Sequence, residues 1–321
     1  MIKVSVIIPV YNITKYLTQA LDSVFAQTLN QNHYEVILVD DGSEISVKDQ
    51  LESYEHFHRI IFIHQPNKGL PSARNAGIKK SKGNFIVFLD ADDMISSEKL
   101  ERQYRILIDN PEASFVYSDA YRSNPYFDVV GRGIRTGKGS SYFDLFFDCA
   151  TTIHAAMCRR LQVVEIGMFD EKMLYNEDDD FWFRLSVNFG DAIYDDYISA
   201  YRRIHISRHS YDDLKVIYFM WKTVEKNSIE FKDALSSQWP RVKAWVKSMR
   251  LNYLFVKNSK ETMLNHDKKY LKNNIQYVGN GVLERYFNYK ALTFLGFMLR
   301  NRRRLLYRIM LQQLKEIILV S

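Results

Sequence analysis

Three residues well suited to chemistry, Asp90, Asp92 and Asp93, lie together in the acidic segment Asp90-Ala91-Asp92-Asp93. Carboxylates two positions apart can share the binding of one hard cation such as Mg²⁺ or Mn²⁺. One carboxylate can ligate the ion while another accepts a hydrogen bond from a ribose hydroxyl. The open coordination positions of the ion suit a diphosphate. An acidic turn that caps the next helix is the plainer alternative, because Asp-x-Asp is a common pattern.

The segment Asp40-Asp41-Gly42-Ser43 forms a second set of polar residues. Gly42 permits a tight turn, and Ser43 can cap a helix. A carboxylate at this position can accept a hydrogen bond from the imide of a base such as uracil. An ordinary turn between a strand and a helix is the alternative.

A third acidic run, Glu177-Asp178-Asp179-Asp180, precedes the aromatic segment 181–183. A carboxylate in this run can take the proton of an attacking hydroxyl group. Acidic residues also favour the first turn of a helix, because they complement the helix dipole. The run alone therefore does not distinguish a general base from a helix start.

The apolar pattern of the first 120 residues predicts the elements that must position these side chains. Continuous apolar runs are typical of strands buried on both faces, and apolar residues at helical spacing are typical of amphipathic helices. The predicted strands are 4–9, 36–39, 60–63, 85–89 and 115–117, and the predicted helices are 17–25, 73–78 and 96–107. This alternation predicts an α/β fold with a mostly parallel sheet and helices on both faces.

Polar residues follow three of these strands at the point where each strand ends. Pro9, Tyr11 and Asn12 mark the end of the first strand, residues 40–43 follow the second, and residues 90–93 follow the fourth. Sheets of this kind bind ligands at the carboxyl ends of their strands. We therefore expect the three segments to converge on one edge of the sheet, which is stronger evidence for a site than any single motif.

The character of the sequence changes near residue 210, where strand signals fade and helical patterns take over. We predict a catalytic domain over 1–210 and a smaller helical, basic region over 211–321. Residues 211–321 hold 21 Lys and Arg against 9 Asp and Glu, about +12, whereas residues 1–210 hold 23 against 29, about −6. The acidic first part suits a cation site, and the basic part suits an anionic partner such as membrane lipid, a polyanion or a diphosphate.

Near the C-terminus, the apolar stretch 286–299 is followed by the arginine-rich segment 300–308. This combination suits a helix at a membrane surface, and it also suits a helix packed on the catalytic domain. No stretch is long enough to span a bilayer, no signal peptide is recognisable, and two cysteines do not make a disulfide framework. We expect a cytoplasmic protein with no nucleic-acid partner. If residues 286–308 form a helix at a membrane surface, the protein is peripheral at the inner face of the cell membrane.

An ordered set of short motifs resembles those of the family 2 inverting glycosyltransferases, which have the GT-A fold. The motifs are Pro9-Val10-Tyr11-Asn12, Asp40-Asp41-Gly42-Ser43, Asn67-Lys68-Gly69 with Ala73-Arg74-Asn75-Ala76-Gly77, Asp90-Ala91-Asp92-Asp93, Gly167-Met168-Phe169-Asp170-Glu171, Glu177-Asp178-Asp179-Asp180-Phe181-Trp182-Phe183-Arg184 and Arg203-Ile204-His205. They cover residues 4–205, about two-thirds of the chain. The resemblance implies a Rossmann-like, nucleotide-sugar-binding sheet.

The resemblance also implies a donor site for a nucleotide sugar. Tyr11 and Asp41 would contact the nucleobase, expected to be uracil, while Arg74 would support the base or the phosphates. Asp90 would reach the ribose. The residues expected to contact the donor are Pro9, Tyr11, Asp41, Arg74, Asp90, Ala91 and Asp92, and those expected to hold Mn²⁺ or Mg²⁺ are Asp92, Asp93 and His205. For His205, a surface histidine or a contact to the diphosphate is the alternative.

On the acceptor side, the family's Glu-Asp pair places the catalytic base on Asp178. The run of four acids leaves Asp179 and Asp180 as rivals. Glu177 and His154 are expected to lie near the acceptor, although a structural role is the alternative for His154.

The activity that the resemblance implies is inverting transfer of a single sugar from a nucleotide sugar to a hydroxyl of a glycan or lipid-linked acceptor, in cell-surface polysaccharide synthesis. The chemistry agrees, because a metal offsets charge on the departing diphosphate while a carboxylate takes the acceptor's proton. A catalytically silent nucleotide-sugar or glycan-binding protein of the same fold is the alternative, disfavoured by the clustered acids. A nucleotidyltransferase is also disfavoured, because residues 9–12 stand where a glycine-rich, basic phosphate loop would be expected.

Overall fold

We describe the protein from a computed structural model, which describes residues 1–12, 15–123, 129–132, 140–147, 151–203 and 213–260. The chain divides into two compact units, Met1–Val242 and Lys243–Ser321. The second unit is described only through the end of α9 (Trp239–Lys260), the helix that runs across the division. The features below belong to the first unit.

The described residues of the first unit form a nine-stranded sheet with the order β3-β2-β1-β4-β8-β6-β9-β5, in which β7 pairs with β6. In chain order the strands are β1 (Val4–Val10), β2 (Tyr34–Asp40), β3 (Ile60–His64), β4 (Phe85–Phe88), β5 (Met94–Ile95), β6 (Phe115–Ser123), β7 (Val129–Arg132), β8 (Ala156–Arg159) and β9 (Ile193–Arg203). The first four strands are parallel, whereas β8 is antiparallel to both β4 and β6. β6 and β9 are parallel, and β5 is antiparallel to β9.

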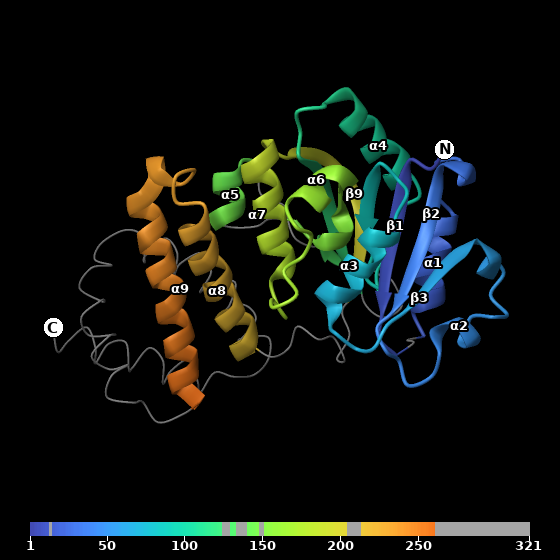
Figure 1. Ribbon diagram of the computed structural model, residues 1–321, viewed down its shortest axis with the longest axis horizontal. Helices are drawn as coiled ribbons and strands as arrows, with labels where there is room; N and C mark the ends of the chain where they lie inside the picture. The colour runs from blue at the N-terminus through green and yellow to red at the C-terminus, as the bar shows by residue number, and fades with distance from the viewer. Residues whose placement is uncertain (13–14, 124–128, 133–139, 148–150, 204–212, 261–321) are drawn as a thin grey trace. The chain divides into compact units, whose positions relative to one another are not determined.

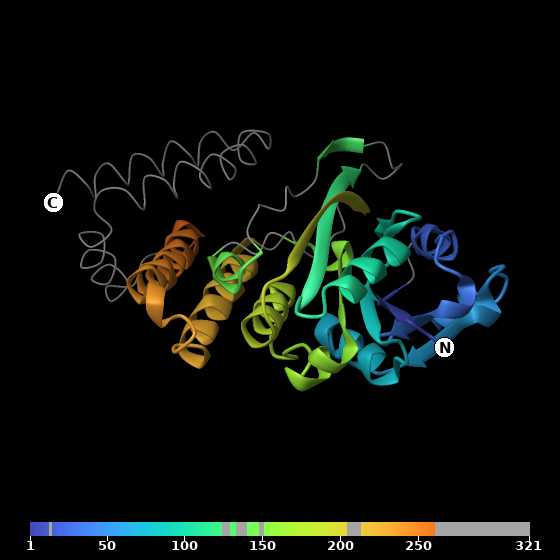
Figure 2. The same ribbon diagram turned by 90° about the horizontal axis from the view of Figure 1, so that it is seen from above.

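Helices cover both faces of this sheet (Figures 1 and 2). On one face, α1 (Leu17–Phe25), α2 (Val47–Gln50) and α4 (Lys99–Asp109) share a buried core with the even-numbered residues of β1. On the other, α3 (Leu70–Lys80), α5 (Tyr142–Phe147), α6 (Arg160–Glu165) and α7 (Glu177–Phe189) share a second core with Ile7. Successive side chains of a strand point to opposite faces, so burial on both faces explains why β1 is apolar at every position except Ser5.

Aromatic residues fix α7, the helix that carries the third acidic run. Phe181 stacks on Phe169 with ring centroids 4.1 Å apart, and Trp182 packs against Phe115 at 4.5 Å. Phe181 and Trp182 are fully buried, and burial of one large apolar side chain contributes roughly 1.5–3 kcal/mol. Because these rings anchor the second turn of α7, the acidic first turn is held in one place.

The α/β class, with a mostly parallel sheet and helices on both faces, is confirmed. The sequence reading did not predict the antiparallel β8 or the long β9, and the helix predicted at 73–78 extends over Leu70–Lys80. The domain boundary expected near residue 210 falls among residues outside the described ranges. The next described helix, α8 (Asp213–Glu230), belongs to the first compact unit.

Candidate active site

The carboxyl ends of β1, β2 and β4 meet at one edge of the sheet. Val10 at the end of β1 pairs with Asp40 at the end of β2, and β4 runs parallel to β1 on its other side. The first two strand ends are also tied together, since the backbone N–H of Asn12 donates to Oγ of Ser43 over 2.8 Å. The three polar segments therefore lie at one edge, as predicted.

The segments after β1 and β2 differ in what they expose. Pro9, expected to contact the donor, is buried within β1, where it pairs with Val39 of β2. Tyr11 is 54% exposed. Gly42 has a φ of +79°, and a Cβ there would lie 2.5 Å from the backbone nitrogen of Asn67. Only glycine fits this turn without displacing the neighbouring segment.

Asp41 is buried at this edge, and its carboxylate organises the loop that precedes α3. Oδ1 accepts hydrogen bonds from the side-chain amide of Gln65 over 2.7 Å and from the backbone N–H of Lys68 over 3.0 Å. Oδ2 accepts from the backbone N–H of Gly69 over 2.9 Å. The residue expected to pair with a nucleobase is therefore also a structural anchor of its own loop.

The acidic segment after β4 has one buried carboxylate and two at the surface. Asp93 is fully buried, and its Oδ1 accepts a hydrogen bond from the backbone N–H of Arg203 over 2.7 Å. Its Oδ2 lies 3.1 Å from Nδ1 of His154, which is also buried. Asp90 and Asp92 are partly exposed. Asp93 thus anchors the segment, and Asp90 and Asp92 are the carboxylates that a ligand can reach.

Arg203, the last residue of β9, holds the same segment from another side. Its side chain is fully buried, Nε donates to the carbonyl of Asp92 over 2.8 Å, and Nη2 donates to Oε1 of Gln19 over 2.7 Å. The guanidinium carbon lies 3.8 Å from the ring centroid of Tyr16. Sequence reasoning missed this role, for which the Arg-x-His pattern was the only signal. His205 of that pattern lies outside the described residues.

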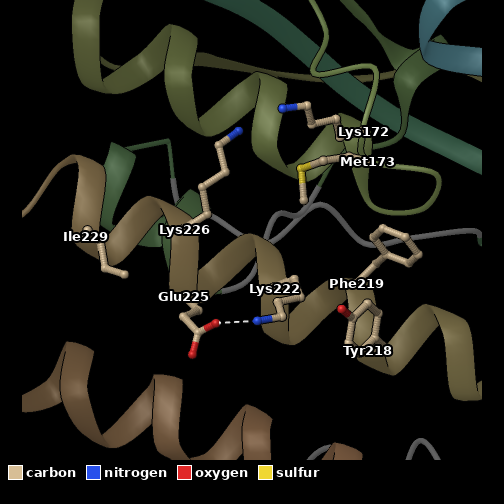
Figure 3. A pocket seen from close by; sticks show the side chains of 8 residues that line it. All are labelled: Lys172, Met173, Tyr218, Phe219, Lys222, Glu225, Lys226 and Ile229. Carbon is tan, nitrogen blue, oxygen red and sulfur yellow. Dashed lines mark hydrogen bonds and ion pairs between the residues drawn. The ribbon is translucent and has the colours of Figure 1, made fainter.

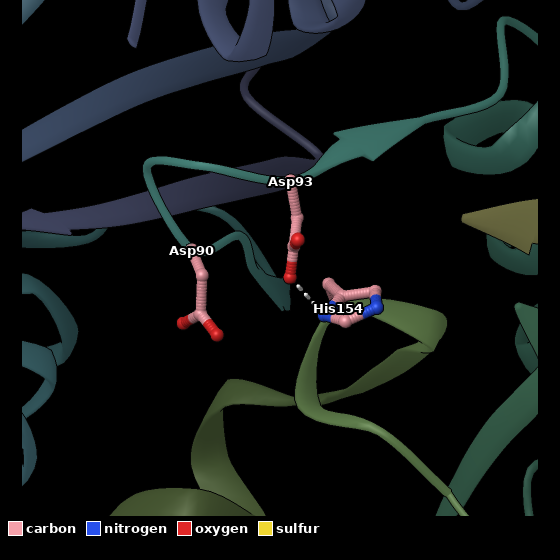
Figure 4. Close-up of side chains that lie close together, drawn as sticks. All are labelled: Asp90, Asp93 and His154. Carbon is pink, nitrogen blue, oxygen red and sulfur yellow. Dashed lines mark ion pairs between the residues drawn. The ribbon is translucent and has the colours of Figure 1, made fainter. Parts of the chain in front are cut away.

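Two carboxylates and one imidazole lie close enough together to share a cation. Asp90, Asp93 and His154 each offer one ligand atom, and these atoms lie within 4.8 Å of one another (Figure 4). The carboxylates suit Mg²⁺ or Mn²⁺, so the residues present fit a divalent cation. The group includes Asp93, which was expected as a ligand, but not Asp92. Asp90 and His154 were expected to contact the ribose and the acceptor, respectively.

Arg74 of α3 connects the acidic segment to the first turn of α7. The residue is 1% exposed. Its Nη2 donates to Oδ1 of Asp90 over 2.9 Å, and its Nη1 donates to Oε1 of Glu177 over 2.6 Å. Sequence reasoning expected Arg74 to support the base or the phosphates of a donor. In the structure, both terminal nitrogens bind carboxylates of the protein.

Asp178 follows Glu177 on α7 and is partly exposed. Burial raises the pKa of the Asp178 carboxyl; Arg74 and Arg202 oppose this rise, and the charge of Asp90 adds to it. Burial also raises the pKa of Glu177 to about 7, against the attraction of Arg74. A carboxylate whose pKa is raised is a stronger proton acceptor once ionised, and this applies to both Glu177 and Asp178.

The two neighbours that the sequence left as rivals have structural partners. Asp180 is fully buried; its Oδ2 accepts from Nε of Arg184 over 2.7 Å, and its Oδ1 accepts from Nζ of Lys226 over 3.1 Å. Oδ2 of Asp179 accepts from Nδ2 of Asn176 over 2.9 Å at the start of the helix. Asp180 is therefore committed to ion pairs, one of which ties α7 to α8.

A groove of about 430 Å³ opens beside the segment that leads into α7 (Figure 3). Its lining residues are Lys172, Met173, Tyr218, Phe219, Lys222, Glu225, Lys226 and Ile229. Nζ of Lys222 lies 2.8 Å from Oε2 of Glu225, and Nζ of Lys226 lies 2.8 Å from Oδ2 of Asp170. Aromatic faces beside amino and carboxylate groups can contact the apolar and polar sides of a saccharide.

Several known proteins that are similar to this chain are named glycosyltransferases. Residues 5–161 match the family model described as glycosyl transferase family 2. Glycosyltransferase GlyA of Streptococcus pneumoniae is 34% identical over 152 residues, which cover 46% of this chain and 20% of that protein. An uncharacterized glycosyltransferase of Rickettsia typhi is 32% identical over 210 residues, or 63% of this chain and 64% of that protein. The chain spans only 26%, 20% and 30% of three relatives, from Rickettsia bellii, S. pneumoniae and Rickettsia felis.

Solved structures of a glycosyltransferase-like fold are also similar to this chain. Residues 1–349 of Staphylococcus aureus TarS, in complex with UDP-GlcNAc, match with a TM-score of 0.63 and 21% identity, over 85% of this chain and 79% of that chain. The UDP complex of the same protein matches with a TM-score of 0.58, over 87% and 81%. At this identity the likeness shows the fold alone, and it confirms the predicted GT-A fold.

Proposed function

We propose, from the premise that this chain carries a glycosyl transferase family 2 domain, that it transfers a single sugar from a UDP-sugar to a hydroxyl of a glycan or lipid-linked acceptor, with inversion at the anomeric carbon. The setting that we propose is cell-surface polysaccharide synthesis. The observation that carries this proposal is the contact of Arg74 with both Asp90 and Glu177. Through this contact, one guanidinium binds a carboxylate near the proposed nucleotide site, Asp90, and a carboxylate beside the proposed proton acceptor, Glu177.

A uridine nucleotide suits the donor side. TarS, which shares the fold, has been solved with UDP-GlcNAc and with UDP. The exposed ring of Tyr11 can stack on uracil beside the end of β1. Oδ2 of Asp41 accepts a hydrogen bond from the backbone N–H of Gly69, and a carboxylate oxygen can accept two. Asp41 can therefore hold its loop and still accept the N–H of the uracil imide.

A divalent cation, Mn²⁺ or Mg²⁺, fits the acidic segment. We propose that Asp92 holds the ion and that Asp90 binds the ribose, with the Asp90, Asp93 and His154 group as the competing position for the ion. When bound, such an ion offsets the negative charge that develops on the departing diphosphate. Asp93 and Arg203 keep the segment in place through buried hydrogen bonds.

Asp178 acts as the general base in this proposal. Its carboxylate takes the proton of the acceptor hydroxyl while that oxygen forms a bond to the anomeric carbon. The bond between the anomeric carbon and the diphosphate oxygen breaks, and its electron pair leaves with the diphosphate. Attack on the face opposite the leaving group inverts the anomeric centre. Glu177, paired with Arg74, and Asp180, paired with Arg184, are less able to take the proton without losing a buried partner.

For the acceptor, we propose that it reaches Asp178 from the side of the groove between α8 and the segment before α7. Met173 and Lys172 of the groove lie only a few residues before Asp178 in the chain. The aromatic rings of Tyr218 and Phe219 give this groove surfaces on which a sugar ring can pack. His154, expected near the acceptor, instead contacts Asp93.

Contact with a membrane surface remains a proposal from sequence. Across the ranges that the structure describes, no helix has the length and apolar character needed to cross a membrane. The apolar stretch and arginine-rich segment, residues 286–308, lie outside those ranges. We propose that this part of the chain binds an anionic membrane surface and brings the enzyme to a lipid-linked acceptor.

A screen of nucleotide sugars by turnover, with and without Mn²⁺, tests the proposed function. We expect one UDP-sugar to be consumed in a metal-dependent reaction, with slow hydrolysis when no acceptor is present. Tight binding of UDP without turnover of any nucleotide sugar would instead favour the catalytically silent binding protein. Absence of nucleotide binding would contradict both.

A further inference from the structure

Arg74 occupies an unusual electrostatic position for a buried residue. Its side chain is 2% exposed, yet it contacts two separate carboxylates, Asp90 after β4 and Glu177 at the start of α7. The charge of Asp178 also acts on it. The cost of burying a guanidinium is offset only when charged partners surround it, so the three carboxylates and Arg74 form one interdependent cluster.

The geometry of the guanidinium explains how one side chain serves two elements. Nη1 and Nη2 each donate to a different carboxylate, over 2.6 Å and 2.9 Å. A planar fork with several donors can hold two acceptors at a fixed separation and angle, which the point charge of lysine cannot do. The ring of Phe169 lies on a further side, with its centroid 5.4 Å from the guanidinium carbon. This packing limits rotation of the fork.

The surroundings of Arg74 do not favour direct contact with a nucleotide-sugar donor. Both terminal nitrogens donate to protein carboxylates, and almost none of the side chain reaches solvent. Asp90 and Asp178, by contrast, are partly exposed. A ligand at the sheet edge therefore meets the carboxylates, and Arg74 lies behind them.

We infer that Arg74 is a positioning residue that sets the donor-side carboxylate of Asp90 and the α7 carboxylates in one arrangement, so that the proton acceptor is aligned with the bound nucleotide sugar. This inference rests on the proposed function. Alignment of reacting groups to a fraction of an ångström is worth a large part of an enzyme's rate, and a misplacement of about 1 Å costs roughly 10²-fold. Loss of Arg74 should therefore act mainly on turnover.

The adjacent residue, Asn75, provides a matched control for a purely structural role. Its Nδ2 donates to the carbonyl of Phe169 and to Oε1 of Glu171, each over 3.0 Å, and its Oδ1 accepts from the backbone N–H of Phe169 over 2.9 Å. Asn75 thus ties α3 to the segment that leads toward α7. It does so with an uncharged side chain whose hydrogen bonds go to Phe169 and Glu171, not to Asp90 or Glu177.

The test compares Arg74→Met, Arg74→Lys and Asn75→Ala in the full chain. The readouts are hydrolysis of the UDP-sugar that wild type consumes, UDP affinity with Mn²⁺ by calorimetry, and Tm. We expect Arg74→Met to lower kcat by roughly 10²-fold, with a much smaller loss of UDP affinity that comes from the Asp90 carboxylate, which Arg74 also positions. Arg74→Lys should recover part of kcat, and Asn75→Ala should lower Tm with kcat nearly unchanged. Hydrolysis needs no identified acceptor.

A double-substitution cycle tests whether the effect of Arg74 on kcat depends on its contact with Glu177. If Arg74 acts through Glu177, then Glu177→Gln added to Arg74→Met should lower kcat little further, because the contact is already lost. Should Arg74→Met fail to fold, Arg74→Lys and Glu177→Gln carry the same comparison.

Two outcomes would overturn the inference. Equal losses of UDP affinity and turnover in Arg74→Met would make Arg74 a donor contact, and equal losses of kcat in Arg74→Met and Asn75→Ala at equal Tm would make it merely structural. A wild type that binds UDP but consumes no nucleotide sugar would instead overturn the proposed function and, with it, this inference.

Discussion

The backbone N–H of Arg203 lies 2.7 Å from Oδ1 of Asp93, so the last residue of β9 is joined by a buried hydrogen bond to the acidic segment after β4. These residues are 110 positions apart in the chain. This bond gives the carboxylates of residues 90–93 two different roles. Asp93 is held inside by Arg203 and His154, whereas Asp90 and Asp92 remain at the edge where a ligand can reach them.

The first prediction concerns Asp92. Asp92→Asn should abolish the Mn²⁺-dependent part of UDP binding and leave Tm unchanged, because the Asp92 side chain is partly exposed. Calorimetry with UDP, with and without Mn²⁺, measures the effect. His154→Gln is the matched control. If Asp92→Asn binds UDP and Mn²⁺ as wild type does while His154→Gln does not, the ion belongs to the Asp90, Asp93 and His154 group.

The second prediction concerns Asp41. Asp41→Ala should weaken UDP binding and also loosen the loop before α3. The substitution leaves the backbone N–H groups of Lys68 and Gly69 without their acceptor, which costs about 1–3 kcal/mol for a buried group. Gln65→Ala, which removes one donor to Asp41, is the control for loop damage. Normal UDP affinity in Asp41→Ala would rule out the contact to the base.

The third prediction concerns the buried Lys99, whose Nζ donates to Oε1 of Gln103 and to the carbonyl of Ala156. Burial lowers the pKa of Lys99 well below its usual value. Between that lowered pKa and the unfolded value of about 10.4, the unfolded chain binds the proton more tightly. The free energy of unfolding should therefore rise with pH across this window.

Lys99→Met removes this dependence. The stability of wild type relative to Lys99→Met should increase from pH 7 to pH 10, as measured by denaturant unfolding. Lys48→Met, which alters an exposed side chain on α2, is the control. A constant difference between wild type and Lys99→Met over this range would show that Lys99 carries no such penalty.

The fourth prediction concerns residues 282–321, which lie outside the described residues. Their apolar stretch and arginines lead us to expect that the full chain binds anionic liposomes and that a chain ending at residue 281 does not. Co-sedimentation with liposomes, at low and at high salt, is the measurement. Equal partitioning of the two proteins would assign this segment a structural role.

Part of this architecture was predictable from sequence because double-sided burial leaves a clear pattern. β1, β2 and β4 are buried along their lengths and mostly apolar, and the polar residues at their ends mark one edge. β9 could not be recognised in the same way, because its sequence Ile193–Arg203 mixes apolar and charged residues and its register to β6 is irregular. Strand pairing in such cases depends on the partner strand more than on local sequence.

The side-chain partnerships were less predictable than the strands. Arg74 and Glu177 are 103 positions apart, and nothing in either local motif specifies the other. The sequence left Asp178, Asp179 and Asp180 as rivals because all three suit a helix start. Only the folded chain separates them, since Lys226 of α8 and Arg184 bind Asp180. The assignment of the base to Asp178 remains a prediction.

Asp178 is also the residue on which the account depends most. Asp178→Asn keeps the size of the side chain, and UDP affinity should change little because this carboxylate is proposed to face the acceptor. Turnover should fall by roughly 10²–10⁴, the usual worth of a positioned proton acceptor. A loss confined to turnover marks an interaction made only in the transition state.

The decisive measurement is the kcat of Asp178→Asn beside that of Asp179→Asn, with the UDP-sugar that wild type consumes and with UDP affinity and Tm recorded for each. Asp179 bonds to Asn176 at the helix start, so its substitution should be mild. The account predicts a large loss of kcat in Asp178→Asn alone, at unchanged UDP affinity. Wild-type turnover in Asp178→Asn would contradict it and leave residues 177–180 as the start of a helix.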